Sequence, residues 1–227
     1  MHIAIPLLVI LAVVFGPQLW ARATFRRFSN EREEYPGNGG ELARHLIERF
    51  GLEGVEVEET TPGGDHYDPR DRRVRLSPEN LNGKSLTAIA VAAHEVGHAL
   101  QHAAGYRPLA LRESLVRFAR FAEKAGALLM LAIPFITLAT RAPSAAILMG
   151  VAGLLSLGSA LLVHLITLPV EWDASFRRAL PILEEGYLPP DELRAARKVL
   201  TAAALTYVAA SLAGLLNLAR WIALLRR

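Results

Sequence analysis

Four long apolar runs, each free of Asp and Glu, constrain this chain more than any other feature of its sequence. Because a helix needs about 20 apolar residues to cross the hydrocarbon core of a bilayer, the runs predict about four transmembrane helices. The second run is short, and only Arg141 and Pro143 separate it from the third, so the two are expected to form a helical hairpin. The runs are Ile3 to Trp20, Ala125 to Thr140, Ala142 to Val170 and Val199 to Ala219.

Basic residues gather in the segments that connect the runs. By the positive-inside rule, both large connecting segments face the cytoplasm and both termini face outward, which predicts a multi-pass protein of the inner or plasma membrane. The residues before Ile3 include no Lys or Arg for a signal peptide, so the first run is expected to be a retained anchor. The net charge of +3 is a weak argument for nucleic acid, and we predict a bilayer with anionic headgroups, not nucleic acid, as a partner. The basic residues that lie next to the apolar runs in these two connecting segments are Arg22, Arg26, Arg27, Arg112, Arg117, Arg120, Lys124, Arg177, Arg178, Arg194, Arg197 and Lys198.

Two charged segments, Val55 to Thr60 and Arg72 to Ser77, alternate with a period of two residues. Alternation of this kind is typical of half-buried strands. If the two segments pair antiparallel, the glutamates of the first can meet the arginines of the second across the sheet. The pattern therefore predicts a small two-stranded β element.

Three helices are predicted in the polar part of the chain. The first covers Glu41 to Phe50, with apolar residues on one face and a glycine directly after it. Ser77-Pro78 is typical of the start of a second helix. Ser85 is the expected N-cap of a third, which covers residues from about 86 to 104 and is rich in alanine.

The third helix contains His94-Glu95-Val96-Gly97-His98, the HExxH pattern. Residues four apart lie one turn from each other on the same helical face, so the two imidazoles can share one metal ion. The chain has no cysteine, and Zn²⁺ accepts histidine and carboxylate ligands. Glu95 can take a proton from a zinc-activated water and return it to the leaving amine. The alternative interpretation is an alanine-rich helix whose histidines are satisfied by local hydrogen bonds.

A third ligand must come from elsewhere in the chain. The metzincin spacing is excluded, because residue 104 is Ala. His102 continues the helical stripe, but three ligands on one straight helix converge poorly on one ion. Glu113 and Glu123 follow on the next segment without supporting context. Glu171, at the end of the third apolar run, is the better candidate, although its spacing alone leaves an ordinary interfacial carboxylate equally open.

Five motifs make the chain similar to the bacterial YugP-type neutral zinc metallopeptidases over nearly its whole length. This resemblance implies zinc ligands at His94, His98 and Glu171 and a catalytic carboxylate at Glu95. The layout is also similar to the HtpX-like and CAAX-processing membrane proteases, which are gluzincin-like. Ser175 stands where those proteases have Asp, which puts a supporting role for that position in doubt. The motifs are DHYDP at Asp65 to Pro69, VRLS at Val74 to Ser77, AVAAHEVGHALQ at Ala90 to Gln101, LPVEWDAS at Leu168 to Ser175 and VLTAAALTYVAA at Val199 to Ala210.

Further residues are candidates for contacts with substrate. His66 and Tyr67 could contact the substrate or polarise its carbonyl, and a role in stabilising their turn is equally open. A substrate could bind extended along Arg72 to Ser77 as an edge strand, which includes Val74. His164 is expected to make structural hydrogen bonds, and Arg177 and Arg178 to anchor the chain at the membrane.

Together these features predict a mainly α membrane protein with about four transmembrane helices and a zincin-like catalytic region that contains a small β-hairpin or sheet. We expect a zinc metalloendopeptidase that cleaves proteins or peptides, including membrane proteins, at the cytoplasmic membrane surface. The alternative is a non-proteolytic, zinc-containing membrane scaffold or chaperone. The expected organisation is an anchor (1–20), a catalytic region (21–124), a transmembrane hairpin (125–168), a cytoplasmic segment with the third ligand (169–198), a transmembrane helix (199–219) and a basic tail (220–227).

Overall fold

The fold is built around α4 (Leu86–Ala103), the helix that contains the HExxH pattern. The computed structural model describes residues 4–140, 147–148, 150–152, 163 and 166–206. Ser85 caps α4 by accepting a hydrogen bond from the backbone N–H of Ala88, and Gly105 adopts a φ of +61° just beyond the last turn. The predicted helix and both of its end signals are confirmed.

Small residues let neighbouring segments approach α4 closely. α2 (Gly39–Arg49) packs on it through buried Leu42 and Leu46, as the apolar face of the first predicted helix requires. A Cβ on Gly39 would lie 2.8 Å from the backbone oxygen of Ala88, a distance that real side chains do not tolerate. α3 (Pro78–Asn82) begins after Ser77, as predicted, and also packs on α4.

The β structure is a three-stranded sheet of β1 (Glu56–Glu59), β2 (His66–Asp68) and β3 (Arg73–Leu76), in the order β1-β3-β2. The predicted antiparallel hairpin is wrong, because β1 pairs parallel to β3. β2 pairs antiparallel with one side of β3, and β1 lies on the other side, where it runs parallel to β3. The expected charge pairing is nevertheless present: Glu58 lies 3.0 Å from Arg73 and 3.1 Å from Arg75.

The segment that begins at residue 166 comes after α5 (Arg107–Thr140) in the chain and packs on α4. It starts with a helical turn at residues 166–172 and continues into a π-helical stretch, η1 (Asp173–Ala179), which packs along α4. A Cβ on Gly97 of α4 would lie only 2.8 Å from the backbone oxygen of Ala174 in η1. The remaining elements are α7 (Leu180–Ile182), η2 (Leu183–Tyr187) and a helix at residues 193–206.

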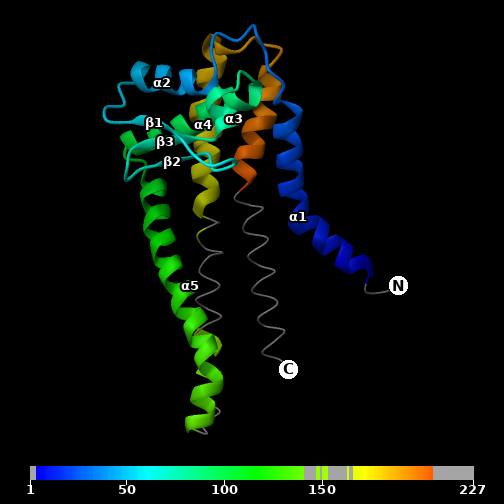
Figure 1. Cartoon of the computed structure of the whole chain (residues 1–227), viewed down its shortest axis with the longest axis vertical. Coiled ribbons are helices and arrows are strands. Elements are labelled where there is room, and N and C mark those ends of the chain that lie inside the picture. The colour runs from blue at the N-terminus through cyan, green and yellow to red at the C-terminus, as the bar shows by residue number, and fades with distance from the viewer. Residues whose placement is uncertain (1–3, 141–146, 149, 153–162, 164–165, 207–227) are drawn as a thin grey trace.

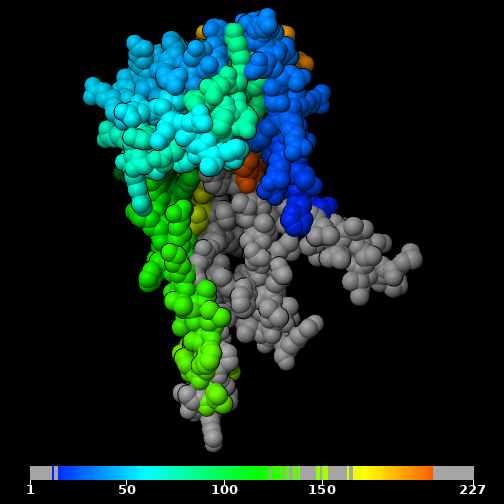
Figure 2. Space-filling model, in the orientation of Figure 1, coloured from blue at the N-terminus to red at the C-terminus, as the bar shows by residue number. Residues whose placement is uncertain are grey.

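Two long helices flank this central part of the molecule. Figure 1 shows α1 (Ala4–Arg27) on one side of α4 and α5 on the other, with α5 extending well beyond the sheet. In the space-filling view, α2, the sheet and the end of α1 form one continuous head from which α5 projects (Figure 2). The HExxH pattern thus lies in the head, between two helices that lead away from it.

The expectation of four transmembrane helices is wrong for the described residues. None of the described helices combines the length and the apolar character that a bilayer crossing requires. The apolar run at Ala125 to Thr140 forms only the second half of α5, whose first half is charged, and most side chains of the run in α1 lie outside the described residues. The runs at Ala142 to Val170 and Val199 to Ala219 lie largely outside the described residues.

Candidate metal centre

His94, His98 and Glu171 meet in the interior of the head. The Oε2 atom of Glu171 lies 3.1 Å from Nε2 of His94 and 3.3 Å from Nε2 of His98. All three side chains are buried, and their ligand atoms lie within 4.8 Å of one another. The described part of the chain contains no second group of three such side chains at this separation. The cluster can therefore hold a metal ion through two nitrogens and one oxygen.

The hydroxyl group of Ser175 sets the orientation of His94. Ser175 Oγ donates a hydrogen bond to the backbone oxygen of Leu200 at 3.2 Å and lies 2.9 Å from Nδ1 of His94. Because the single hydroxyl proton goes to Leu200, the serine oxygen accepts from the Nδ1–H of His94. The lone pair of Nε2 is then directed at the cluster. Ser175 thus does support the imidazole, by a shorter side chain than the Asp of the related layouts.

Gln101 orients His98 in the same way. Its amide nitrogen donates to the backbone oxygen of Val170 at 2.8 Å and to Oδ2 of Asp173 at 2.9 Å. The amide oxygen is therefore the atom that lies 2.9 Å from Nδ1 of His98 and accepts its proton. Arg178, expected at the membrane surface, instead donates from Nε to Asp173 at 2.8 Å. These contacts leave Nε2 of His98 free to face Glu171.

Glu171 divides its two oxygens between different partners. Oε2 faces both imidazoles, whereas Oε1 lies 3.2 Å from Nη1 of Arg112, on α5. The guanidinium group of Arg112 favours the ionised form of this carboxylate, and the contacts fix both of its oxygens.

Glu95 lies beside the cluster and is only 6% exposed. Within the described residues its carboxyl group makes no hydrogen bond or ion pair, so its oxygens are available to a small molecule that enters the site. Burial raises the pKa of Glu95 to about 7. A carboxyl group in these surroundings can both accept and release a proton near neutral pH.

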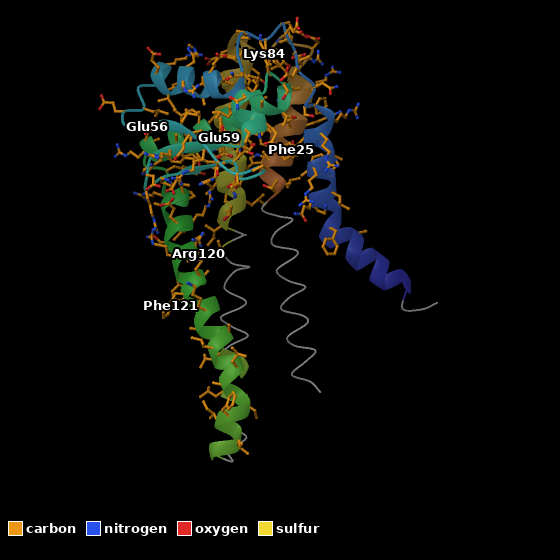
Figure 3. All side chains as sticks on the ribbon, in the orientation of Figure 1. Phe25, Glu56, Glu59, Lys84, Arg120 and Phe121 are labelled. Carbon is orange, nitrogen blue, oxygen red and sulfur yellow. The ribbon has the colours of Figure 1, made fainter. Side chains whose placement is uncertain are left out.

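A cavity of about 1040 Å³ leads to the cluster. Its wall includes His94, Glu95, His98 and Glu171, together with side chains from α1, α5 and the loop that carries β2. Phe25 on α1 and Arg120 on α5, both labelled in Figure 3, mark two parts of this wall. The cavity gives a peptide access to the buried carboxyl group and to the two imidazoles.

The predicted substrate residues fall into two groups. His66 and Tyr67 of β2 line the cavity, and the hydroxyl group of Tyr67 lies 2.8 Å from Nδ1 of His102. Val74, in contrast, is fully buried and does not line the cavity. Its strand, β3, is paired on both sides, so the expected edge-strand position at Arg72 to Ser77 is wrong.

The other candidate ligands lie outside the cluster. His102 bonds Tyr67, and Glu113 lines the cavity without joining the three ligand atoms. The side chain of Glu123 and the whole of His164 lie outside the described residues. Arg177 is exposed on η1.

Residues 3–226 match the family described as "Putative neutral zinc metallopeptidase". The chain belongs to this neutral zinc metallopeptidase family. A relative from Bacillus subtilis (strain 168), named "Putative membrane protease YugP", is 38% identical over 218 residues, which cover 93% of this chain and 91% of the relative. No solved structure matches the chain. The predicted family is confirmed, and zinc is the metal that the family and the buried cluster both indicate.

Proposed function

We propose that this neutral zinc metallopeptidase is an endopeptidase that holds zinc through His94, His98 and Glu171 and moves protons through Glu95. The observation that carries the proposal is the arrangement of lone pairs. Ser175 and Gln101 take the Nδ1 protons, so both Nε2 lone pairs point at an ionised carboxylate oxygen. Such a cluster is repulsive unless a cation lies within it. A zinc ion suits this set of donors.

The chemistry follows from the position of each side chain. A bound zinc ion supplies Lewis-acid chemistry, activating water and polarising the peptide carbonyl. Glu95 accepts a proton from the attacking water while the water oxygen bonds to the carbonyl carbon. As the C–N bond breaks, Glu95 returns that proton to the leaving amine. The low exposure of Glu95 keeps bulk water from competing for the proton.

The substrate is proposed to bind extended beside β2. This strand is an edge of the sheet, and His66, Tyr67 and Asp68 all line the cavity that reaches Glu95. An edge strand offers unpaired backbone groups to which a peptide can add as a further strand. This geometry favours cleavage within an unfolded segment of a protein.

We place the reaction at a membrane, with the active site on the cytoplasmic side. Two things support the membrane: the printed name of the relative, and exposed apolar side chains along α5 such as Phe121, Phe135 and Leu138. The cytoplasmic side is proposed from the basic residues of the connecting segments. The expected observation is that the protein sediments with membranes, and that added protease cuts the head only in inverted vesicles. Cutting in intact spheroplasts would contradict the cytoplasmic side.

The decisive experiment compares zinc content with cleavage in purified wild type and Glu95→Gln. A peptidase requires Glu95 for the proton steps, whereas a zinc-containing scaffold or chaperone does not. We expect Glu95→Gln to retain one zinc ion per chain and to lose cleavage of an unfolded protein by at least about 100-fold. Wild type that binds zinc but cleaves no more than the variant would favour the scaffold.

A further inference from the structure

Four arginines line the cavity at a distance from the metal cluster. Arg22 and Arg26 come from α1, and Arg117 and Arg120 come from α5. All four are exposed, and none forms an ion pair with any residue that the structure describes. The cavity wall therefore carries four guanidinium groups that form no ion pair within the described part of the protein.

The spacing of these arginines makes each pair unfavourable by itself. Residues three or four positions apart lie on the same face of a helix, and like charges at this spacing destabilise the helix. Arg22 and Arg26 are four apart, and Arg117 and Arg120 are three apart. Each pair turns its charges toward the same cavity. An anionic ligand would relieve this repulsion on both walls.

Among the described residues, the acidic side chains of the cavity form no ion pair with the four arginines. Asp65 accepts hydrogen bonds from Ser77 and Asn80, and Asp68 pairs with Arg75 at 3.0 Å. Glu79 and Glu113 also line the cavity, but neither is paired with the four arginines. Within the part of the chain that the structure describes, the one side-chain hydrogen bond that the four guanidinium groups make runs from Nη2 of Arg117 to Oγ of Ser114 at 3.2 Å, so their charges are available to a ligand that enters the cavity.

We infer that the enzyme prefers peptide substrates with Asp or Glu on both sides of the cleaved bond, and that the two arginine pairs bind these carboxylates. The inference rests on the proposed peptidase function. α1 and α5 lie on opposite sides of α4 (Figures 1 and 3), so the pairs are placed to hold the two ends of a peptide that passes the metal cluster. Guanidinium groups bind carboxylates with two parallel hydrogen bonds, which suits this role.

The test uses two quenched fluorescent peptides that are identical except that Glu in one is replaced by Gln in the other. Both are offered to the zinc-loaded full chain, to Arg22→Gln/Arg26→Gln and to Arg117→Gln/Arg120→Gln. Wild type should cleave the acidic peptide with a higher kcat/KM, and each double variant should lose about three- to tenfold on the acidic peptide alone. Rising salt should abolish the preference in wild type.

Arg194→Gln/Lys198→Gln is the matched control, because it removes two exposed charges four residues apart that do not line the cavity. It should leave both peptides unaffected. Equal kcat/KM for the two peptides in wild type, or an unchanged preference in the cavity variants, would overturn the inference while leaving the peptidase function intact.

Two further outcomes separate the inference from its rivals. If wild type cleaves neither peptide, the proposed peptidase function fails. Fluorescence anisotropy then measures the Kd of the acidic peptide for wild type and for the two cavity variants. An unchanged Kd in the cavity variants would overturn the inference that the arginines bind carboxylates. If those variants lose binding to vesicles that contain phosphatidylglycerol but keep the preference for the acidic peptide, the arginines bind headgroups and the inference is wrong.

Discussion

Ser175 Oγ lies 2.9 Å from Nδ1 of His94 and donates its own proton to the backbone oxygen of Leu200. The serine therefore determines which nitrogen of His94 carries a proton and which one can bind zinc. We expect Ser175→Ala to weaken zinc binding by about 10- to 100-fold, measured by competition with a chromogenic chelator. Ser114→Ala is the control, since its hydroxyl group donates to the backbone oxygen of Ala110 and accepts from Arg117, both in the first part of α5 and away from the zinc ligands. Equal zinc affinities for the two variants would refute this role of Ser175.

Gln101 is fully buried and bonds three partners at once. Replacing it by Leu keeps the size of the side chain but leaves His98, Asp173 and the backbone oxygen of Val170 without these bonds. We expect Gln101→Leu to lower the free energy of unfolding by about 1–3 kcal/mol and to reduce zinc affinity as well. Urea unfolding measures the first effect. Gln18→Leu makes the same chemical change at an exposed site on α1 and should be nearly neutral.

Zinc should stabilise the folded chain, because the cluster exists only when α4 and residue 171 come together. Free zinc at 100 times its Kd is expected to raise the free energy of unfolding by about 2.7 kcal/mol relative to the chelated protein. His94→Ala and Glu171→Ala should show little of this gain. A zinc-dependent shift of the same size in both variants would place the metal elsewhere.

Gly97 marks the closest approach of η1 to α4. A Cβ at this position would lie 2.8 Å from the backbone oxygen of Ala174, and backbone cannot move aside as a flexible side chain can. We predict that Gly97→Ala destabilises the fold by about 1–3 kcal/mol and disturbs zinc binding, because Glu171 and Ser175 flank this contact. Gly16→Ala on α1, where a Cβ meets nothing within 4 Å, should be neutral or slightly stabilising. Thermal unfolding of the two variants distinguishes these outcomes.

The parts of the fold with strong local signals were predictable from the sequence. Ser85 and Gly105 bound α4, and the spacing of His94 and His98 places them on one face whatever the rest of the chain does. The direction of β1 was not predictable, because alternation with a period of two residues is the same for parallel and antiparallel strands. β2 is only three residues long and lies in a turn-rich stretch, so its pairing depends on distant residues.

The site shows the same division between local and distant information. Gln101 follows His98 by three positions on the same helical face, a signal that could have identified it as a partner of His98. Arg112 offered no such signal, because its contact with Glu171 depends on the direction in which α5 leaves α4. For the described helices, apolar composition alone overstated the number that can span a bilayer, because it does not report where a helix begins or how charged its first turns are.

The carboxylate of Glu171 follows its imidazole partners by 77 and 73 positions along the chain. A nascent polypeptide therefore displays the histidine pair on the ribosome well before the acidic group has been translated. Ser175, which orients one of the rings, is made later still. The metal centre therefore cannot assemble until the segment that carries residues 171 and 175 has been made, so a nascent chain that ends before this segment lacks one of the three ligands.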